Sequence, residues 1–512
     1  MAPTPPSQGG GVDPATLDFL LSGRAFAGER PERRIDTHAA MIFLTKDHAW
    51  KLKRPVALGY LDFSTPAARH DALIAEDRLN RRTAPRLYQG VHAITRGDAG
   101  LALDGPGPAV DWLLEMTRFP DGALLSERAT RGDLDPTILM TLAERIQRFH
   151  GMATIVLGPG AARRFAKVVA GNAEAAAHYP AYLDPMRSAA LNTRLKALTE
   201  KLAPQLEARG LRGHVRRCHG DLHLANIAML DGAPTPFDCL EFDEALATTD
   251  VLYDLAFLLM DLWARGLRCE TNLVINRYLD LAAAEEDAFE LLPLFMAVRA
   301  QIRAHVAAAQ ASLADQAGGH AEAGRYLALA EHLTDPVAPR LIAIGGLSGS
   351  GKSTIARCLG GFIGAAPGAR ILRSDVLRKH RAGVAPETRL DADAYTPSEA
   401  EAVYTALDGQ AGRLLGEGAS VIADAVFGDE AMRINIRAVA ERKSATFIGF
   451  WLDASEAKCE ARVSGRGPDA SDATAAVLHQ QSQVIVAPAD WIRIDAGGAP
   501  DEVLADIRVR LG

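Results

Sequence analysis

A glycine-rich segment at residues 346–353, with the sequence Gly-Leu-Ser-Gly-Ser-Gly-Lys-Ser, limits the fold of this chain more than any other feature. It follows the apolar run 341–344, which is typical of a buried parallel strand. In the pattern G-x-x-x-x-G-K-[ST], glycines let backbone N–H groups converge on phosphate oxygens at the start of a helix. The segment therefore predicts a strand, a phosphate-binding loop and a helix in succession. The alternative interpretation is a flexible glycine turn that binds nothing.

The chain after this loop repeats the alternation of apolar runs with helical stretches. The further strand candidates are Ile371–Leu372, Ser420–Ala423, Phe447–Leu452 and Trp491–Ile494. Five strands separated by helices predict an α/β domain with a five-stranded, doubly wound parallel sheet. Two X-Pro pairs in residues 331–339 restrict the backbone and predict a linker before it. We therefore expect residues 340–512 to form one P-loop domain.

Residues in and just after the glycine loop are of the types that hold a nucleotide. The Lys352 ammonium would reach the β- and γ-phosphates, and the Ser353 hydroxyl would ligate magnesium. The other predicted nucleotide contacts are Gly346, Ser348, Gly349, Ser350, Gly351 and Thr354. These assignments predict ATP and Mg²⁺ as cofactors of this domain.

Charged residues follow the later strands of the predicted sheet, where side chains face the nucleotide crevice. Asp375 is placed to orient or deprotonate an acceptor hydroxyl, and Asp424 to hold magnesium through water. Arg462 and Arg466 lie in a basic segment after the fourth strand and would close over the transferring phosphoryl group. The plainer alternatives are that Asp375 caps a helix and that the two arginines are only solvated.

Four motifs occur together in this part of the chain: G-L-S-G-S-G-K-S-T, R-S-D-V-L-R-K, V-I-A-D-A-V-F and R-x-x-x-R-G. In this combination, residues 340 to about 495 resemble the small P-loop kinases related to gluconate kinase, zeta toxins and chloramphenicol phosphotransferase. The resemblance implies phosphoryl transfer from ATP to the hydroxyl group of a small molecule. None of the motifs specifies the acceptor.

A second motif of a different kind stands at residues 219–226, His-Gly-Asp-Leu-His-Leu-Ala-Asn. Its spacing suits a kinase catalytic loop, in which Asp221 accepts the hydroxyl proton and Asn226 coordinates magnesium. Asp238, after a predicted hairpin turn at residues 231–232, would be the second metal ligand. The motif therefore predicts a second site for ATP and Mg²⁺.

Residues far upstream of this motif would complete the second site. Lys53, with Lys51 on the same face of a predicted strand, would contact the α- and β-phosphates. Glu76, on the predicted helix that follows the strand, could pair with the lysine. This arrangement is the one that a kinase needs to hold a nucleotide.

The 219–226 motif also has two other interpretations. His219, Asp221 and His223 could ligate a metal ion, although no fourth ligand accompanies them. The segment could instead be a solvated loop without function. We expect His219 to support the loop rather than to transfer a proton.

The first 330 residues divide into a part rich in predicted strands and a part rich in predicted helices. The strand candidates are Met41–Leu44, Ala49–Lys53 and Asp111–Met116, and the helix candidates are Arg69–Arg82, Thr141–His150, Asn192–Glu207 and Leu291–Ala311. A small sheet-bearing lobe followed by a large helical lobe predicts an α+β, kinase-like two-lobed domain over residues 13–330. Residues 1–12, rich in Pro, Gly and Ser, predict a disordered tail.

Several motifs of this first part also occur together: H-G-D-L-H-L-A-N, F-D at residues 237–238 and D-L-A at residues 254–256. Through them, residues 30 to about 310 resemble the aminoglycoside phosphotransferase and choline kinase superfamily. The motifs W-K-L-K-R-P, L-D-F-S-T and L-N-R-R, with the tandem order, are similar to a bacterial group of bifunctional aminoglycoside phosphotransferase/ATP-binding proteins. The sequence departs from the superfamily in two ways: no glycine-rich loop precedes Lys51, and F-D-C-L-E replaces the commoner I-D-W or I-D-F.

The composition disfavours several classes of function. A net charge of -8 argues against a general nucleic-acid binder, which needs a basic surface. The most apolar segment, residues 251–260, is too short to span a bilayer and contains Asp254. Five cysteines without a C-x-x-C pair suit reduced thiols. We therefore expect a cytoplasmic protein whose partners are small-molecule acceptors, not nucleic acids or membranes, while the sequence leaves the oligomeric state open.

Together these observations predict a bifunctional, ATP- and Mg²⁺-dependent phosphotransferase that acts on small-molecule hydroxyl groups at two sites. The alternative is that the first domain is a pseudokinase that senses a ligand and regulates the P-loop domain. We favour the enzyme because Asp221, Asn226 and Asp238, which catalysis requires together, are all present.

Overall fold

The computed structural model describes residues 11–37, 39–58, 61–314, 318–465, 467 and 469–511. The chain forms two compact units, one of Met1–Ala161 with Arg209–Asp254 and one of Ala162–Ala208 with Leu255–Gly512. Residues 1–10 of the predicted tail lie outside the described ranges, and the first helix is α1 (Pro14–Leu21). Among the described residues, none of the helices has the length and apolar content that a membrane span requires.

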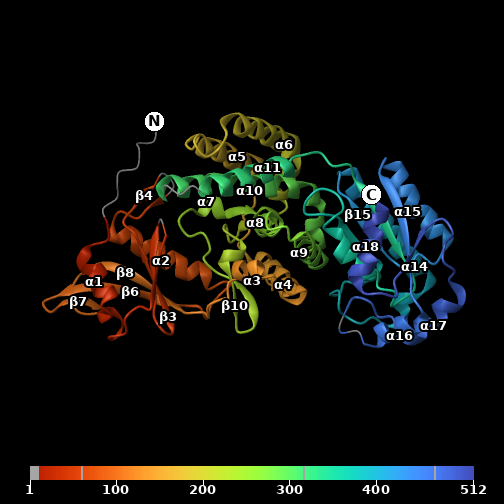
Figure 1. The fold of residues 1–512 in the computed structure, drawn as a ribbon, viewed down its shortest axis with the longest axis horizontal. Coiled ribbons are helices and arrows are strands. Elements are labelled where there is room, and N and C mark those ends of the chain that lie inside the picture. Colours follow the sequence, from red (N-terminus) through yellow and green to blue (C-terminus); the bar gives the residue numbers. More distant parts are fainter. Residues whose placement is uncertain are drawn as a thin grey trace. The chain divides into compact units, whose positions relative to one another are not determined.

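The first unit is built on an antiparallel sheet with the strand order β1-β2-β3-β8-β6-β7. Its strands are β1 (Arg33–Asp36), β2 (Ala40–Leu44), β3 (His48–Lys53), β6 (Tyr88–Gly97), β7 (Gly100–Leu103) and β8 (Ala109–Thr117). Helix α2 (Pro66–Asn80) follows β3 and begins at the N-cap Thr65, whose hydroxyl accepts a hydrogen bond from the Ala68 amide. Figure 1 draws this sheet in red and orange, with α2 beside it.

Side chains on β3 alternate between the two faces of this sheet. Trp50 belongs to a buried apolar cluster with α1, while Ala49 packs with Leu73 of α2 in another cluster. Lys51 and Lys53 are separated from Ala49 by even steps, so both lysines lie on the face that α2 covers. Because side chains alternate along the strand, both lysines face α2, and this helix supplies their partner Glu76.

Short elements surround the 219–226 motif in the same unit. They are α3 (Leu125–Arg131), α4 (Pro136–Met152), β9 (Val215–Arg217), β10 (Ile227–Leu230), β11 (Ala233–Pro236) and β12 (Thr248–Asp250). Strand β9 pairs with β12, and β10 pairs with β11. The predicted hairpin turn joins β10 to β11, where Asp231 and Gly232 have φ of 49° and 75°. The motif thus lies in the loop between β9 and β10.

The second unit combines helices with a parallel sheet. Its helices before the sheet include α9 (Arg268–Leu281), α10 (Leu292–Ala314) and α11 (Gly318–Leu333), while α5 (Ala161–Ala177), α6 (Pro185–Leu211) and α8 (Val251–Ala264) cross the limit between the units. Helix α11 ends at Leu333 and the first strand of the sheet begins at Arg340. The boundaries that the sequence suggests at residues 13, 331 and 340 remain predictions.

The parallel sheet of this unit has the strand order β14-β15-β13-β16-β17. Its strands are β13 (Arg340–Gly345), β14 (Arg370–Arg373), β15 (Val421–Asp424), β16 (Thr446–Asp453) and β17 (Ile492–Asp495). The helices between and after them are α12 (Lys352–Gly360), α13 (Ser374–Arg381), α14 (Pro397–Gly416), α15 (Glu430–Arg442), α16 (Glu456–Ser464), α17 (Ala475–Val484) and α18 (Pro500–Leu511). All five strands are parallel, and the chain places β14 and β15 on one side of β13 but β16 and β17 on the other. Sheets of this kind bind ligands beside the carboxyl ends of the strands at the point where the chain changes sides.

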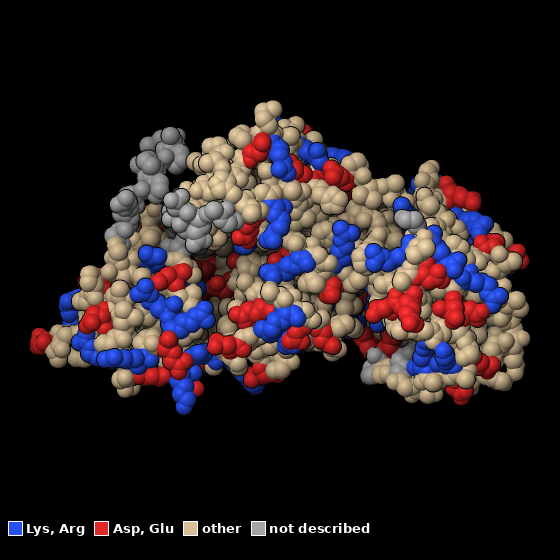
Figure 2. Space-filling model, in the orientation of Figure 1, with Lys and Arg blue, Asp and Glu red and all other residues tan. Residues whose placement is uncertain are grey.

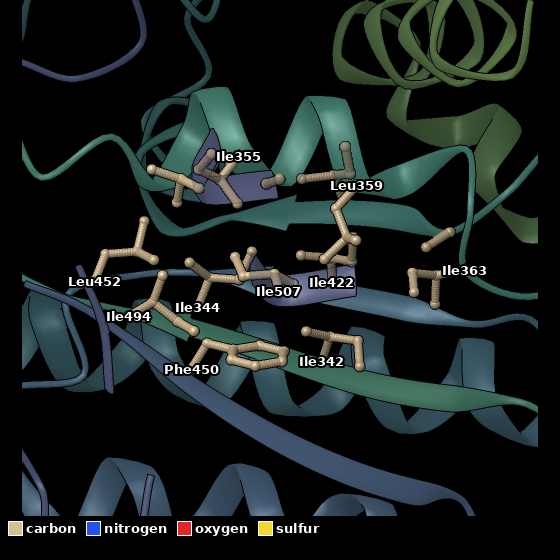
Figure 3. Close-up of a cluster of buried hydrophobic side chains, with 14 of the residues drawn as sticks. Ile342, Ile344, Ile355, Leu359, Ile363, Ile422, Phe450, Leu452, Ile494 and Ile507 are labelled. Carbon is tan, nitrogen blue, oxygen red and sulfur yellow. The ribbon is translucent and has the colours of Figure 1, made fainter. Parts of the chain in front are cut away.

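A buried apolar cluster fixes helices α12 and α18 against one face of the parallel sheet. Ile342 and Ile344 of β13 meet Phe450 of β16, Ile355 of α12 and Ile507 of α18 in this cluster (Figure 3). Helices α14 and α15 also contact β13, and their buried side chains are not part of the cluster, which places these helices on the other face. Because both faces are covered, the three inner strands β13, β15 and β16 are largely apolar.

Both predicted fold classes are confirmed, an α+β kinase-like first domain and an α/β domain with a five-stranded parallel sheet. The five strand candidates of the second part correspond to β13–β17. The structure adds β1, β6 and β7, which the sequence did not predict. Strand β1 is mostly exposed and reads Arg-Arg-Ile-Asp, so it shows no apolar pattern.

Candidate active sites

The glycine loop between β13 and α12 has a left-handed backbone at three positions. Gly346, Gly349 and Gly351 have φ of 138°, 81° and 100°, values that residues other than glycine rarely adopt. A Cβ atom on Gly349 would also lie 2.4 Å from the carbonyl oxygen of Cys459. Gly351 is the N-cap of α12, so the loop ends at the unpaired amides of a helix N-terminus. An anion is stabilised at such a position.

Three polar side chains meet beside this loop. The Lys352 ammonium donates hydrogen bonds to the carbonyl oxygens of Gly346 and Leu347, each at 2.9 Å. The Ser353 hydroxyl donates to Asp424 Oδ2 at 2.6 Å, and Asp424 ends β15, the neighbour of β13 in the sheet. A hydroxyl and a carboxylate beside helix-terminal amides and an ammonium form a donor set that fits Mg²⁺ with the phosphates of ATP.

The remaining predicted loop residues differ in their surroundings. The Ser348 amide donates to Gln481 Oε1 at 2.9 Å. Ser350 Oγ is buried and makes no hydrogen bond to any described residue, so this hydroxyl is available to a phosphate oxygen. Thr354 lies in the first turn of α12 with an exposed side chain. Ser348 and Ser350 therefore belong to the loop environment more closely than Thr354.

Asp375 is half-buried in the first turn of α13, immediately after β14. The N-cap of that helix is Arg373, so the alternative interpretation of Asp375 as the cap is wrong. Burial raises the pKa of Asp375; the Arg373 guanidinium opposes this shift, and the Asp424 charge adds to it. A carboxyl group with a raised pKa beside a candidate metal ligand suits proton acceptance from a hydroxyl.

Arg462 of α16 lies against the glycine loop. Its Nη1 donates to the Ser350 carbonyl oxygen at 3.3 Å, and its Nη2 donates to the Ala496 carbonyl oxygen at 3.0 Å. These bonds position the guanidinium, so the interpretation of Arg462 as merely solvated is wrong. Arg466 lies outside the described residues.

Arg373 is a cation in this site that the sequence did not single out. It is buried, its Nη2 donates to Asp469 Oδ1 at 2.9 Å, and its Nε lies 3.5 Å from Asp424 Oδ2. Arg373 ends β14, and the pairing of β14 with β15 brings it beside Asp424. The only sequence signal was its place in the R-S-D motif, because Asp469 comes from a distant loop.

Charged side chains also converge in the first unit. The Lys51 ammonium donates to Glu76 Oε1 at 2.6 Å and to Asp238 Oδ1 at 2.8 Å. The Lys53 ammonium pairs with Glu76 Oε2 at 2.7 Å and with Glu241 Oε1 at 2.5 Å. Glu76 is fully buried between the two lysines. Both lysines therefore pair with the predicted glutamate, and Lys51 is the one that also contacts Asp238.

Burial and mutual attraction set the charge states of this cluster. Burial acts to lower the pKa of Lys51, but the Asp238 and Glu76 carboxylates outweigh it and raise that pKa. Burial acts to raise the pKa of Asp238, but Lys51 and Lys53 outweigh it and lower that pKa. Lys51 and Asp238 are therefore both charged near neutral pH, as a phosphate contact and a metal ligand require.

The catalytic-loop candidate holds its two central residues together. Asn226 Nδ2 donates to Asp221 Oδ2 at 2.9 Å and to the Asp221 carbonyl oxygen at 3.0 Å. Gly220 has φ of 87°, and a Cβ atom there would lie 2.8 Å from Leu240 Cβ, so the position requires glycine. The loop thus presents a carboxylate and an amide oxygen as neighbours, which is the pair that a kinase loop provides.

The histidines of this loop have different partners, although His223 Nε2 lies 3.5 Å from Asp221 Oδ2. The two ring nitrogens of His219 are used within the loop region, one by the Phe237 carbonyl oxygen and one by the Asp221 amide. His223 caps the short helix that follows. Within the described ranges, three potential ligands come together at His150, Cys218 and Asp254. The predicted alternative of a His219–Asp221–His223 metal cluster therefore has no support, and His219 supports the loop as expected.

Comparison with known families finds two domains. Residues 55–292 match the family described as the phosphotransferase enzyme family, and residues 341–488 match the family described as an AAA domain. The chain carries a phosphotransferase domain followed by a P-loop kinase domain. Kinases of these families use ATP, typically with Mg²⁺.

Several proteins are similar to this two-domain phosphotransferase. Uncharacterized proteins of Mycobacterium tuberculosis (strain H37Rv) and Mycobacterium bovis are 29% identical to it over 474 residues, which cover 90% of this chain and 92% of each relative. A gluconokinase structure from Sinorhizobium meliloti is 20% identical over 34% of this chain and 93% of its own, with a TM-score of 0.25. The Mycobacterium tuberculosis APS kinase is 20% identical over 35% of this chain and 99% of its own, with a TM-score of 0.26. A Plasmodium vivax ethanolamine kinase is 11% identical over 58% of this chain and 81% of its own, with a TM-score of 0.37.

Asp254 supports the catalytic-loop candidate of the phosphotransferase domain. Its Oδ1 accepts from the Gly220 amide at 2.7 Å, and its Oδ2 accepts from the His219 amide at 3.1 Å. His150 Nε2 lies 3.1 Å from the same Oδ2, and Asp254 is fully buried. Because both carboxylate oxygens already accept N–H groups, the cluster of His150, Cys218 and Asp254 is a support for the loop rather than a metal site.

Two residues of the phosphotransferase domain hold the segment around Asp238, and sequence reasoning missed both. The Asp238 amide donates to Tyr88 Oη at 3.1 Å, and the Cys239 amide donates to Asn80 Oδ1 at 2.7 Å. Asn80 lies one helical turn after Glu76 on α2, so one face of this helix contacts both the lysines and Cys239, the residue that follows the metal-ligand candidate. No local motif marks Asn80 or Tyr88, because their partners are distant in sequence.

Proposed function

We propose that the protein is a bifunctional phosphotransferase in which each domain transfers a phosphoryl group from ATP to the hydroxyl group of a small molecule. ATP bound with Mg²⁺ would supply the phosphoryl group and neutralise its charge at each site. The two sites differ in the elements that bind the phosphates, a strand lysine in the first domain and a glycine loop in the second. The acceptors therefore need not be related.

In the P-loop kinase domain, Lys352 and the loop amides bind the β- and γ-phosphates. Ser353 and Asp424 hold the metal ion, and their contact at 2.6 Å supports this role. Asp375 orients the acceptor hydroxyl and takes its proton as the new O–P bond forms. The raised pKa of Asp375 supports this role, because a more basic carboxylate accepts a proton more readily.

Arginines complete the proposed P-loop site. Arg462, which is bound to the Ser350 carbonyl oxygen at 3.3 Å, and Arg466 neutralise the charge that develops on the transferring group. Arg373 is proposed to keep Asp424 in position through its contact at 3.5 Å. Gly346, Ser348, Gly349, Ser350, Gly351 and Thr354 form the proposed nucleotide environment.

In the phosphotransferase domain, Asp221 takes the proton of the acceptor hydroxyl. Asn226 and Asp238 hold the metal ion, and Lys51, oriented by Glu76, contacts the α- and β-phosphates. Lys53, the second lysine of the strand, assists from the same face.

One observation carries the assignment of two active sites rather than one. Lys51 contacts both Glu76 and Asp238, at 2.6 and 2.8 Å. A kinase needs the strand lysine, the helix glutamate and the metal-binding aspartate in one place. A module that only senses a ligand has no need of all three.

The test is a screen for ATP consumption with the full-length protein and two single-site variants, Lys352→Ala and Asp221→Asn. The acceptor panel contains sugars, sugar acids, aminoglycosides and amino alcohols. We expect each variant to lose turnover with one class of acceptor and to keep it with another. Asp231→Asn, in an exposed hairpin turn, is the matched control and should behave as wild type.

Two outcomes of the screen are decisive. If every acceptor depends on Lys352 and Asp221→Asn changes nothing, the first domain is a ligand-sensing module. If neither variant affects ATP consumption, the assignment of both sites is wrong.

We also propose that the protein works in the cytoplasm without nucleic-acid or membrane partners. Its five cysteines are free thiols, which are usual in a reducing compartment. Acidic and basic side chains are interspersed on the face seen in Figure 2, whereas a nucleic-acid binder needs a basic surface. These observations support small molecules as the partners.

A further inference from the structure

Strand β14 lies at an edge of the parallel sheet, and an edge strand leaves backbone groups that need partners. Helix α9 supplies them. Asn276 Oδ1 accepts from the Ile371 amide at 2.8 Å, while Asn276 Nδ2 donates to the Ala369 carbonyl oxygen at 3.1 Å. Asn272, one turn earlier, donates to the Ala369 and Pro367 carbonyl oxygens at 2.8 and 3.1 Å. Two asparagine side chains therefore bind one backbone group of β14 and two carbonyl groups of the segment that leads into it.

A buried guanidinium ties the same edge to α9 and to the turn of helix that follows it. Arg370, the first residue of β14, is 4% exposed. Its Nε donates to Glu286 Oε1 at 2.6 Å, and its Nη1 donates to Asp280 Oδ1 at 2.8 Å and Asn276 Oδ1 at 2.9 Å. Arg413 of α14 donates to the other oxygen of Glu286 at 2.9 Å. Because an unpaired buried charge is strongly destabilising, Arg370 keeps this position only while the two carboxylates face it.

The contact continues along the chain to α13, the helix that carries Asp375. His380 lies near the end of α13, and its ring nitrogen Nε2 is 2.7 Å from the carbonyl oxygen of Asp280 in α9. Arg277 of α9 pairs at 2.5 Å with Glu387, which follows α13. Helix α9 thus holds the β14–α13 segment before and after Asp375.

We propose that α9 is a working part of the P-loop kinase site and that Asn276, Asp280 and Glu286 are positioning residues for Asp375. They act through β14 and α13 and contact neither nucleotide nor acceptor. This inference rests on the proposed function, because it takes Asp375 as the residue that orients the acceptor. It also extends the second kinase backwards to residues 268–286, although these residues match the phosphotransferase family.

The position of α9 predicts which kinetic constant changes when the contact is lost. Replacing the Asn276 amide leaves the Ile371 N–H without its partner and leaves the Ala369 carbonyl bonded to Asn272 alone, which loosens the edge strand on its α9 side. Helix α9 also packs against α12, which carries Lys352 and Ser353, but the hydrogen bonds of Asn276 go to residues 369–371 and to Asn272. Its replacement should therefore leave the groups that bind ATP in place. A displacement of about 1 Å at a reacting group costs about 10²-fold in rate. The turnover number should therefore fall while KM for ATP stays the same.

The test uses the full-length protein, with ATP as substrate and water as acceptor, and takes as signal the hydrolysis that Lys352→Ala abolishes. Asn276→Leu removes every side-chain hydrogen bond and keeps the branching of the side chain, whereas Asn276→Asp keeps the acceptor oxygen for Ile371 and loses the donor. We expect kcat to fall by about 10²-fold in Asn276→Leu and by less in Asn276→Asp, with KM for ATP unchanged. Glu270→Gln, a half-buried position on the same helix, is the matched control and should retain wild-type constants.

Amide hydrogen exchange in the same proteins gives a readout that needs no turnover. We expect the Ile371 amide to exchange about tenfold faster in Asn276→Leu, because it loses its hydrogen bond, and to be unchanged in Glu270→Gln. Faster exchange with an unchanged kcat would show that α9 only packs against the sheet, and the proposal would be wrong. Wild-type kcat and wild-type exchange in both Asn276 variants would overturn it as well.

Failure of the proposal and failure of the proposed function look different in this design. If the Asn276 variants behave as wild type while hydrolysis still depends on Lys352, the kinase assignment stands and α9 has no positioning role. If wild-type hydrolysis is independent of Lys352, the P-loop assignment fails, and with it the positioning of Asp375 for transfer. Should Asn276→Leu not fold, Asn276→Asp decides by kcat alone, because it keeps the acceptor of the Ile371 amide: a lower kcat supports the proposal and a wild-type kcat overturns it.

Discussion

Asp375 illustrates how one charge state can control the P-loop kinase. Burial raises its pKa above the ordinary aspartate value of about 3.9. A carboxyl group with a raised pKa takes up its proton at a higher pH, so the carboxylate proposed to orient the acceptor is lost as pH falls through that raised value. The rate of the P-loop site should therefore decline on the acid side at a higher pH than an ordinary aspartate would cause.

The measurement is a rate–pH profile of the P-loop site, with Asp221→Asn silencing the other domain. Asp375→Asn should lower the rate by about 10² to 10⁴ and remove this acid limb, since the amide does not titrate. An acid limb that persists unchanged in Asp375→Asn would assign it to another group.

In the first domain, Asp221 and Asp238 should fail in different ways when they are replaced. Asp238→Ala removes the proposed metal ligand and one of the carboxylates that Lys51 contacts, so Mg·ATP binding should weaken strongly. Asp221→Asn keeps the shape of the loop and should lose turnover while binding stays close to wild type. Calorimetric titration of the full-length protein carrying Lys352→Ala isolates this domain. Equal weakening by both substitutions would contradict the separate roles.

The glycine loop gives a prediction at the scale of elements, because two glycines of similar φ lie in different surroundings. Gly349 and Gly418 have φ of 81° and 87°, but a Cβ on Gly349 would lie 2.4 Å from a carbonyl oxygen, whereas Gly418 has open space. Gly349→Ala should therefore displace the loop and abolish ATP binding by the second domain. Gly418→Ala should cost about 1 kcal/mol of unfolding free energy and leave binding intact. Binding is measured by calorimetry and stability by denaturant unfolding; equal binding in both variants would mean that the loop adapts.

Whether a strand could be predicted from the sequence depends on how much of its surface is buried. Strands β13 to β17 lie in a sheet covered on both faces, so most of them read as apolar runs. Strand β6 is half-exposed and contains Gly90 and Arg96, and β1 lies at a sheet edge, so neither shows an apolar pattern. Their place in the sheet depends on pairing with distant strands, which no local pattern contains.

The same distinction separates the site residues. Lys352, Ser353, Asp221 and Asn226 stand in short motifs whose spacing reflects the chemistry directly. The residues that sequence reasoning missed come from separate elements and act through hydrogen bonds across long stretches of chain. They are Arg373, Asp469, Tyr88, Asn80, Asn276 and Gln481. Such residues become visible only when tertiary packing brings their partners together.

At the scale of the whole molecule, the contact of α9 with β14 predicts the behaviour of a cut chain. A protease site placed in residues 334–339 would separate α9 from the parallel sheet covalently. Because Asn276, Asp280 and Glu286 hold Arg370 and the edge strand, the two pieces should remain associated after cleavage. Gel filtration at micromolar concentration checks this, and the same cut in Asn276→Leu should release more of the C-terminal piece. Complete separation of the wild-type pieces would contradict the expectation.

The long stretch of chain between α9 and its partner strand also sets an order of events during synthesis. Asn276 and Ile371 are 95 residues apart in the chain. At about 5–20 residues per second, α9 is made roughly 5 to 20 s before the strand that it will cover. During this interval the side chains of α9 that will bind β14, namely Asn272, Asn276 and Asp280, present amide and carboxylate groups to water. A nascent chain can carry such a face without exposing the apolar surface from which aggregation starts.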